Sequence, residues 1–130
     1  MDHYFTREEA EALLPEITVV LRKIQEAHRH VQAVEEELEA LQMQAMGNGH
    51  HLHERIKRLQ RDVVTRVQAL RNAVDELQDF GCELKDPETG LIDFLGLRDG
   101  KEIYLCWRLG EERIAFWHYL NTGFAGRQPF

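Results

Sequence analysis

Six residues in the final third of the chain have side chains that could bind or react with a small ligand. They are Asp93, Tyr104, Cys106, Arg108, Arg113 and Trp117. A carboxylate beside a thiol could act as a base or hold a metal ion, arginines can hold an anion, and aromatic rings wall many ligand pockets. Aromatic and arginine side chains are also enriched in protein interfaces. We therefore favour a dimer interface or second packing layer, with a ligand site as the alternative.

Two turn sequences would place these residues on one face of a small sheet. Asp99-Gly100 suits a two-residue type I′ hairpin, and Gly110-Glu111 suits a type II′ hairpin. The strands predicted around these turns and before them are Cys82–Lys85, Leu91–Leu95, Lys101–Arg108 and Arg113–Tyr119. The resulting register puts Asp93 opposite Cys106 and Tyr104 opposite Trp117.

This register predicts the composition of each face, because side chains alternate along a strand. The core face would carry Ile92, Phe94, Ile103, Leu105, Trp107, Ile114, Phe116 and His118. The mixed face would carry Leu91, Asp93, Leu95, Tyr104, Cys106, Arg108, Arg113, Ala115 and Trp117. His118 is thus predicted to be a hydrogen-bonded core histidine on the face opposite to Cys106, rather than a metal ligand.

Other metal and redox arrangements are disfavoured by spacing. Cys82 and Cys106 would lie two strands apart, about 9.6 Å, which exceeds the reach of a disulfide and favours free thiols. His50 and Glu54 could share a metal ion at the turn between the helices, but we favour a solvated loop that leads into the second helix. The sequence has no HExxH, phosphate-binding loop, dinucleotide fingerprint or GxSxG motif. We therefore predict no metal, no cofactor and no catalytic residue.

The first two-thirds of the chain predict two long helices. Thr6 and Glu9 have the spacing of a capping box, and Pro15 should kink the first helix or open a second one. Apolar residues then recur every seven positions, which is typical of a coiled-coil seam. The two interleaved series are Leu13, Val20, Ala27, Val34 and Leu41, and Ile17, Ile24, Val31, Leu38 and Ala45.

A break at Gly47-Asn48-Gly49 separates this seam from a second one. The second seam comprises Leu52, Ile56, Leu59, Val63, Arg66, Leu70, Ala73, Leu77 and Phe80. Equal lengths and a short connection favour an antiparallel hairpin. We predict a single α+β domain over 1–130. Its parts would be a kinked helix (6–46), a second helix (50–80), a β-meander of three or four strands (82–119) and a C-terminal tail (120–130).

The charged residues and the apolar residues outside the seams indicate how the helices pair and whether two chains associate. Glu35–Glu39 contains four acidic residues that would face the basic cluster Lys57, Arg58 and Arg61 across the hairpin, so this cluster needs no nucleic acid to balance it. Apolar residues off the seams, such as Val19 and Val64, should be buried against the sheet or a second hairpin. A homodimer forming a four-helix bundle is the assembly we favour.

Composition narrows the function class. The net charge of −7 argues against nucleic-acid binding, and there is no run of apolar residues long enough to span a membrane. The first residues lack the basic and apolar segments of a signal peptide, so we expect a cytoplasmic location.

Several of these motifs together carry a family resemblance. They are Phe5-Thr6, Glu9-Ala10 and Leu13-Leu14-Pro15, then Lys85-Asp86, Gly90-Leu91-Ile92-Asp93-Phe94, Leu105-Cys106-Trp107-Arg108-Leu109-Gly110-Glu111, Trp117-His118 and Gly123-Phe124-Ala125-Gly126-Arg127. The chain resembles the bacterial family called domain of unknown function 2203 over nearly its whole length. The resemblance implies a bacterial cytoplasmic protein and supplies no catalytic residues.

We interpret the chain as a non-catalytic, dimeric interaction or regulatory module, which could also bind an unidentified protein partner. The alternative is a small-ligand- or metal-binding protein, possibly an enzyme, that uses the mixed sheet face.

Overall fold

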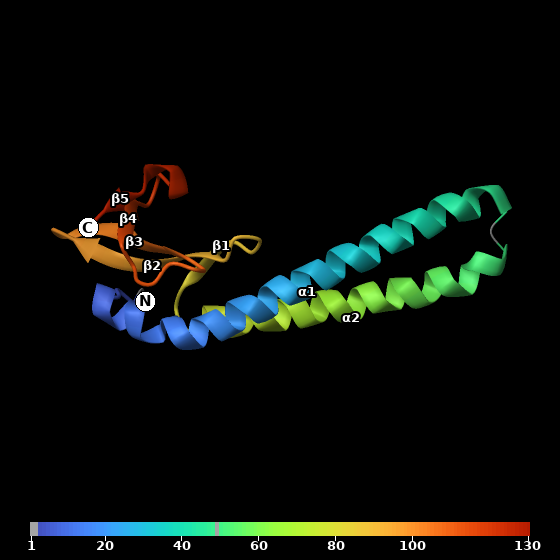
Figure 1. Cartoon of the computed structure of the whole chain (residues 1–130), viewed down its shortest axis with the longest axis horizontal. Helices are drawn as coiled ribbons and strands as arrows, with labels where there is room; N and C mark the ends of the chain where they lie inside the picture. Colours follow the sequence, from blue (N-terminus) through green and yellow to red (C-terminus); the bar gives the residue numbers. More distant parts are fainter. Residues whose placement is uncertain (1–2, 49) are drawn as a thin grey trace.

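The computed structural model describes residues 3–48 and 50–130 and confirms the α+β class. Figure 1 shows a long helical hairpin that projects from one end of a small sheet. The elements are α1 (Arg7–Asn48), η1 (His50–Leu52), α2 (His53–Gln78), β1 (Glu83–Asp86), β2 (Leu91–Arg98), β3 (Lys101–Arg108), β4 (Phe116–Tyr119), η2 (Phe124–Gly126) and β5 (Gln128–Pro129). The strands form one antiparallel sheet in the order β1-β2-β3-β4-β5.

The start of α1 follows the predicted capping box. The Thr6 hydroxyl accepts a hydrogen bond from the Glu9 amide at 3.1 Å, and the Glu9 carboxylate accepts one from the Thr6 amide at 3.1 Å. Hydrogen bonding of the Glu9 carboxylate to the Thr6 amide, and then to the Thr6 side chain, lowers the pKa of Glu9. Pro15 lies inside one continuous helix, so the expectation that it might open a second helix is wrong. The blue N-terminal part of α1 nevertheless runs at an angle to the rest (Figure 1), as a proline that clashes with the preceding turn would cause.

The hairpin is packed tightly beside the sheet and loosely farther out. Ile17, Ile24 and Leu77 near the sheet are fully buried. In the described part of the chain beyond Ile24, the buried apolar residues of α1 are Val31 and Leu41, and those of α2 are Ala73 and Leu77. The other seam residues of the outer hairpin are half-buried. Two helices alone therefore leave the outer seam partly open.

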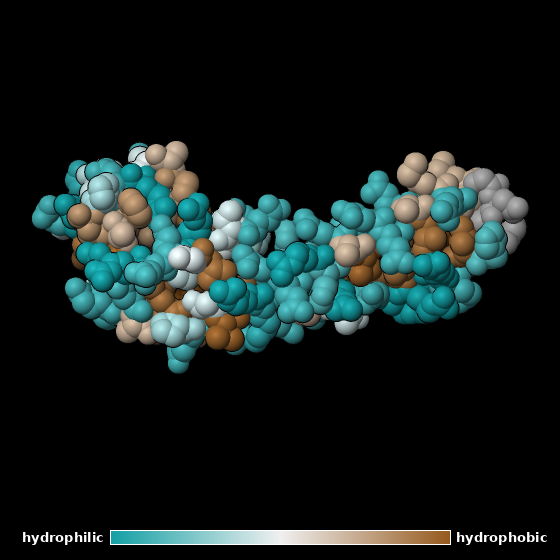
Figure 2. All heavy atoms as spheres, in the orientation of Figure 1, coloured by the Kyte–Doolittle hydropathy of each residue, from teal (hydrophilic) through white to brown (hydrophobic). Residues whose placement is uncertain are grey.

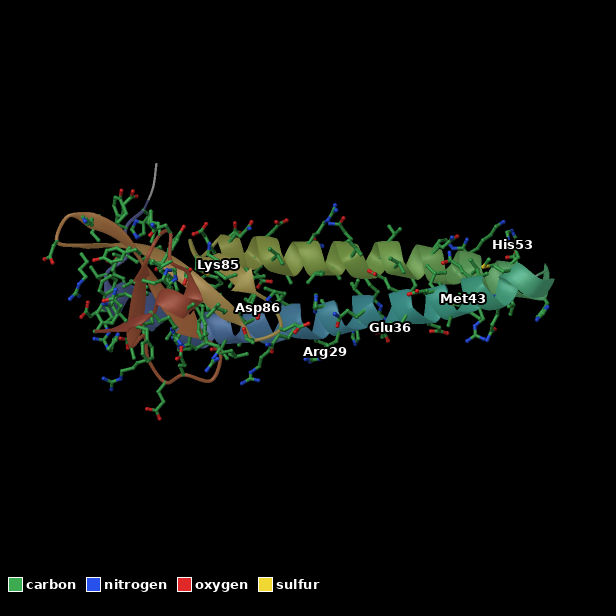
Figure 3. All side chains as sticks on the ribbon, turned by 90° about the horizontal axis from the view of Figure 1, so that it is seen from above. Arg29, Glu36, Met43, His53, Lys85 and Asp86 are labelled. Carbon is green, nitrogen blue, oxygen red and sulfur yellow. The ribbon has the colours of Figure 1, made fainter. Side chains whose placement is uncertain are left out.

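Polar contacts across the hairpin fix its register. Glu37 of the predicted acidic cluster forms an ion pair at 2.9 Å with Arg55, which lies outside the predicted basic cluster of Lys57, Arg58 and Arg61. The Arg66 guanidinium lies 3.2 Å from His30 Nδ1, in an exposed contact that also joins the two helices. Figure 3 shows the two helices side by side from above, with labelled α1 residues seven positions apart. None of the described helices is long and apolar enough to cross a bilayer.

The pairing of β2 with β3 is the predicted one. Asp93 lies opposite Cys106, and Arg98 lies opposite Lys101. Asp99 and Gly100 have φ angles of 50° and 79°, as a type I′ turn requires. β2 extends to Arg98, beyond its predicted end. The core face of this pair packs against the helices through Ile92, Phe94, Ile103, Leu105 and Trp107.

The pairing of β3 with β4 differs from the prediction by one residue. Tyr104 lies opposite His118, and Leu105 lies opposite Trp117. Trp117 therefore joins the core face, whereas the prediction put it on the mixed face. His118 and Phe116 move the other way, onto the face that carries Cys106, so their predicted positions are also wrong.

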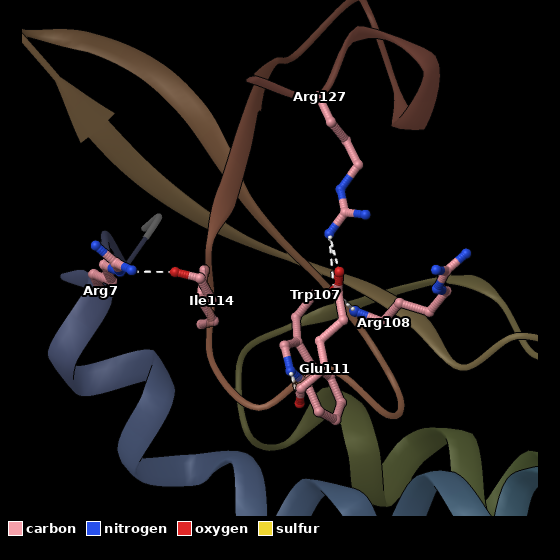
Figure 4. Close-up of polar contacts among 6 residues, drawn as sticks. All are labelled: Arg7, Trp107, Arg108, Glu111, Ile114 and Arg127. Atoms are coloured by element: carbon pink, nitrogen blue, oxygen red, sulfur yellow. Dashed lines mark hydrogen bonds and ion pairs between the residues drawn. The ribbon is translucent and has the colours of Figure 1, made fainter. Parts of the chain in front are cut away.

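Glu111 explains this shift (Figure 4). The turn after β3 closes with a hydrogen bond from the Glu111 amide to the Arg108 carbonyl, one residue earlier than predicted, with Gly110 at φ 105°. The Glu111 carboxylate then accepts from the Arg108 amide at 2.7 Å, and the Glu111 carbonyl accepts from the Trp107 indole at 3.1 Å. These bonds replace the expected strand pairing, so β4 begins at Phe116 instead of Arg113.

The predicted C-terminal tail also contains structure. β5 pairs with β4, placing Pro129 opposite Phe116, and the Phe130 amide donates to the Ala115 carbonyl at 3.1 Å. The sheet thus has a fifth short strand beyond the three or four predicted. Figure 1 shows this dark-red C-terminal segment on the side of the sheet away from the helices.

Candidate metal centre

Three potential metal ligands meet on the sheet face that points away from the helices. Asp93, Cys106 and His118 come from the adjacent strands β2, β3 and β4, and their exposed fractions are 2%, 0% and 2%. The carboxylate oxygen, thiol sulfur and ring nitrogen all lie within 4.8 Å of one another. We call these three residues the trio.

Strand alternation brings the trio together. Asp93 and Cys106 are direct cross-strand partners, and His118 is the partner of Tyr104, which lies two residues before Cys106 on the same face. The one-residue shift of β4 is therefore what adds the histidine. Without it, His118 would face the helices, as the prediction had it.

The hydrogen bonds of His118 show what each of its two ring nitrogens contacts. Its Nδ1 lies 2.8 Å from the Tyr119 carbonyl oxygen, and since a carbonyl only accepts, Nδ1 is the donor. Its Nε2 lies 3.0 Å from Asp93 Oδ2. One proton is therefore shared between Nε2 and the carboxylate, and the pair is either a neutral acid with imidazole or a carboxylate with imidazolium.

Asp93 is an unusually costly residue to bury. Burial raises its pKa, while His118, Cys106 and Lys85 each oppose that rise. Its second oxygen, Oδ1, accepts no hydrogen bond within ordinary geometric limits from the described residues, although the Cys106 thiol is close enough to the carboxyl group to act as a weak donor. A buried acceptor without a partner destabilises a protein by about 1–3 kcal/mol. This oxygen therefore has an unused capacity to bind a donor or a cation.

The Cys106 thiol is held in its protonated form. Burial, followed by the charge of Asp93, raises the pKa of Cys106 to about 12. Both nitrogens of His118 are already engaged, so the imidazole has no free nitrogen with which to deprotonate the thiol. The arrangement does not match a Cys–His nucleophile pair. It matches a ligand set whose protons would leave when a metal ion binds.

A cavity of 160 Å³ lies against the trio. It is lined by Lys85, Leu91, Asp93, Tyr104, His118, Leu120, Gly123 and Phe124. The Lys85 ammonium lies 4.9 Å from the centre of the Tyr104 ring. The neighbouring Glu83 carboxylate, with burial, raises the pKa of Tyr104 to about 12, so its hydroxyl stays protonated.

The remaining predicted site residues lie elsewhere. Trp117 is in the core, Arg113 is exposed in the loop before β4, and Arg108 stacks 5.6 Å from the Phe124 ring at the exposed end of β3. Cys82 is buried separately, with its thiol 3.6 Å from the Leu77 carbonyl, and both cysteines are free thiols as predicted. The metal ion that His50 and Glu54 could share, a weaker alternative to a solvated loop, involves a His50 side chain outside the described part of the structure.

The sequence interpretation missed a second buried polar contact. Arg127 of the C-terminal segment binds both Glu111 oxygens, at 2.8 and 2.9 Å (Figure 4). Its guanidinium also lies 4.1 Å from the centre of the Phe116 ring. It thereby fastens the C-terminal segment to the loop before β4. The sequence interpretation treated Glu111 only as part of a turn. Arg127 follows sixteen positions later, and no sequence motif links the two residues.

The chain matches a known protein family over almost its whole length. A family model described as "Uncharacterized conserved protein (DUF2203)" matches residues 3–130. Neither the curated proteins nor the solved structures contain a match to the chain.

Proposed function

We propose a function for this chain, which belongs to the uncharacterised DUF2203 family: it binds a zinc-class divalent metal ion through Asp93, Cys106 and His118. The observation that carries the proposal is the convergence of these three buried side chains, whose ligand atoms lie within 4.8 Å of one another. Bonds of about 2.0–2.3 Å to a central ion would set the ligand atoms about 3.3–3.6 Å apart. The Asp93–His118 pair, now at 3.0 Å, would therefore move slightly apart, and any wider pair would close.

The donor types favour zinc over harder ions. Zn²⁺ binds imidazole nitrogen, thiolate and carboxylate, whereas Mg²⁺ and Ca²⁺ take oxygen ligands. His118 donates a hydrogen bond from Nδ1 to a backbone carbonyl, and this bond orients Nε2 toward Asp93 and Cys106. Metal-bound histidines are commonly oriented by a hydrogen bond of this kind. A metal ion would also satisfy the Asp93 Oδ1 atom that lacks a hydrogen bond.

The test is metal binding by chelator-treated, full-length protein. We expect one Zn²⁺ or Co²⁺ per chain, with a sulfur-to-cobalt charge-transfer band that reports a thiolate ligand. Asp93→Asn and Cys106→Ala should each weaken metal affinity by at least about 10–100-fold. Cys82→Ala is the matched control, because Cys82 is also a buried free thiol but lies outside the trio. Cobalt binding without the thiolate band, or unchanged in Cys106→Ala, would refute the proposal.

We also propose that the chain forms a homodimer through its hairpin, as an interaction module of the bacterial cytoplasm, where free thiols persist. Support comes from the outer seam, which two helices leave half-buried, and from Val19 and Val64, which are 64% and 69% exposed. A second hairpin is the occupant that would complete a four-helix core. Figure 2 shows apolar atoms, tan and brown, among the teal surface of the hairpin.

Sedimentation of wild type and Val64→Glu tests this dimer. Wild type should sediment as a dimer at micromolar concentration, and the buried charge of Val64→Glu should shift it to monomer. Ala69→Glu, an equally exposed position of α2 on a different face of the helix from Val64, should remain dimeric. A monomeric wild type would contradict the proposal.

A further inference from the structure

The cavity beside the trio has a position for a second ligand. Asp93 and His118 contribute to its lining, whereas Cys106 lies behind them, fully buried. Zinc in proteins is commonly four-coordinate, and a site with three protein ligands keeps one position for a small molecule. This inference therefore rests on the metal site proposed above and concerns what occupies its remaining position.

The charges around the cavity favour a ligand with one negative charge. A carboxylate and a thiolate would already neutralise a divalent ion, and Lys85 adds one positive charge at the cavity wall. Lys85 is close enough to the trio to lower the pKa of Asp93. Its ion pair with Glu83 is long, at 3.8 Å, and partly exposed, so it contributes little and leaves the ammonium able to bind a ligand.

The cavity walls define the rest of the ligand. Leu91, Leu120 and Phe124 contribute apolar surface to the lining. The volume of 160 Å³ is well above the space that a single water molecule needs, so a small organic ligand fits. We propose that the cavity binds a small aliphatic carboxylate, whose head group occupies the open metal position beside Lys85 and whose short chain contacts these apolar residues.

Titration of the cobalt-loaded full-length protein with butyrate tests the proposal. Butyrate should change the visible spectrum of the bound cobalt, and it should bind more tightly than acetate by about tenfold because it buries two more methylene groups. Lys85→Met should weaken butyrate binding by about tenfold or more while leaving cobalt affinity within about threefold. Lys101→Met is the control, since Lys101 also lies over a tyrosine, 6.0 Å from the Tyr119 ring, but outside the cavity.

The possible failures are distinguishable. If cobalt binds but butyrate leaves its spectrum unchanged, or if Lys85→Met binds butyrate like wild type, the ligand inference is wrong and the metal site stands. If inorganic phosphate binds as tightly as butyrate, the assignment to aliphatic carboxylates is wrong. If cobalt does not bind, both the metal site and this inference are wrong.

Discussion

The proton shared by Asp93 and His118 shows how a few residues set the chemistry of the outer sheet face. The Tyr119 carbonyl fixes the histidine tautomer, and the histidine in turn stabilises a carboxyl group that burial disfavours as an anion. The sequence did predict Asp93 beside Cys106, because both flank one turn with a clear signature. It did not predict His118, because its face depends on a turn whose geometry is set by Glu111.

Both cysteines should make stability fall at alkaline pH. Burial raises the pKa of Cys82 and of Cys106 from 9.0 to about 12. The folded chain therefore keeps protons that the unfolded chain releases. The stability that the two protonated thiols contribute is fully present below about pH 9 and is lost as the pH rises toward 12. The free energy of unfolding should fall by up to about 1.4 kcal/mol per pH unit for each thiol.

Urea denaturation of metal-free protein between pH 8 and 11 measures this dependence. Cys82→Ala and Cys106→Ala should each reduce the slope by about one proton, after comparison at pH 8 corrects for lost packing. An unchanged slope in both variants would show that the thiols titrate normally in the folded state.

At the scale of elements, the loop between β3 and β4 matters most. The Glu111 carboxylate bonds to the Arg108 amide and to Arg127, so one side chain sets the β4 register and holds the C-terminal segment. Strand pairing can be predicted where the backbone makes all the bonds, as at Asp99-Gly100. The pairing of β3 with β4 could not be predicted in this way, because the Glu111 carboxylate takes the place of a backbone acceptor in the strand pairing. Its partner Arg127 is also distant in the sequence.

Glu111→Gln should loosen this corner of the sheet. The change removes the charge opposite Arg127, whose side chain is only 11% exposed, and we expect a loss of about 2–4 kcal/mol. Amide hydrogen exchange should accelerate at Gln128 and Phe130. The matched control is Glu112→Gln, an exposed change in the same loop that should alter stability by less than about 0.5 kcal/mol. Equal effects of the two variants would contradict the role given to Glu111.

Across the whole molecule, packing density falls along the hairpin. The seven-residue pattern predicted the two helices and their pairing, since it is long and uninterrupted except at Arg66. It did not predict how deeply each position is buried. That depends on whether the sheet or only the opposite helix covers it: Ile24 is fully buried, whereas Leu38, at an equivalent seam position, is half-buried.

Ile24→Ala and Leu38→Ala should therefore differ in effect. In dilute solution we expect a loss of about 2–5 kcal/mol for Ile24→Ala and of about 1 kcal/mol for Leu38→Ala. If two hairpins associate, the effect of Leu38→Ala should grow with protein concentration, while that of Ile24→Ala stays constant. Denaturation at two concentrations gives both values. Equal losses in dilute solution would show that the outer hairpin is as well packed as the inner one.

Because the trio lies on the side of the sheet away from the helices, the hairpin can change in length without altering the trio. Asp93, Cys106 and His118 lie on the side of the sheet turned away from α1 and α2. Adding seven residues to each helix would keep the seam in phase and carry the tip outward by about 10 Å. The hairpin can therefore serve as an adjustable arm, whose reach can change without any alteration at the polar end of the molecule.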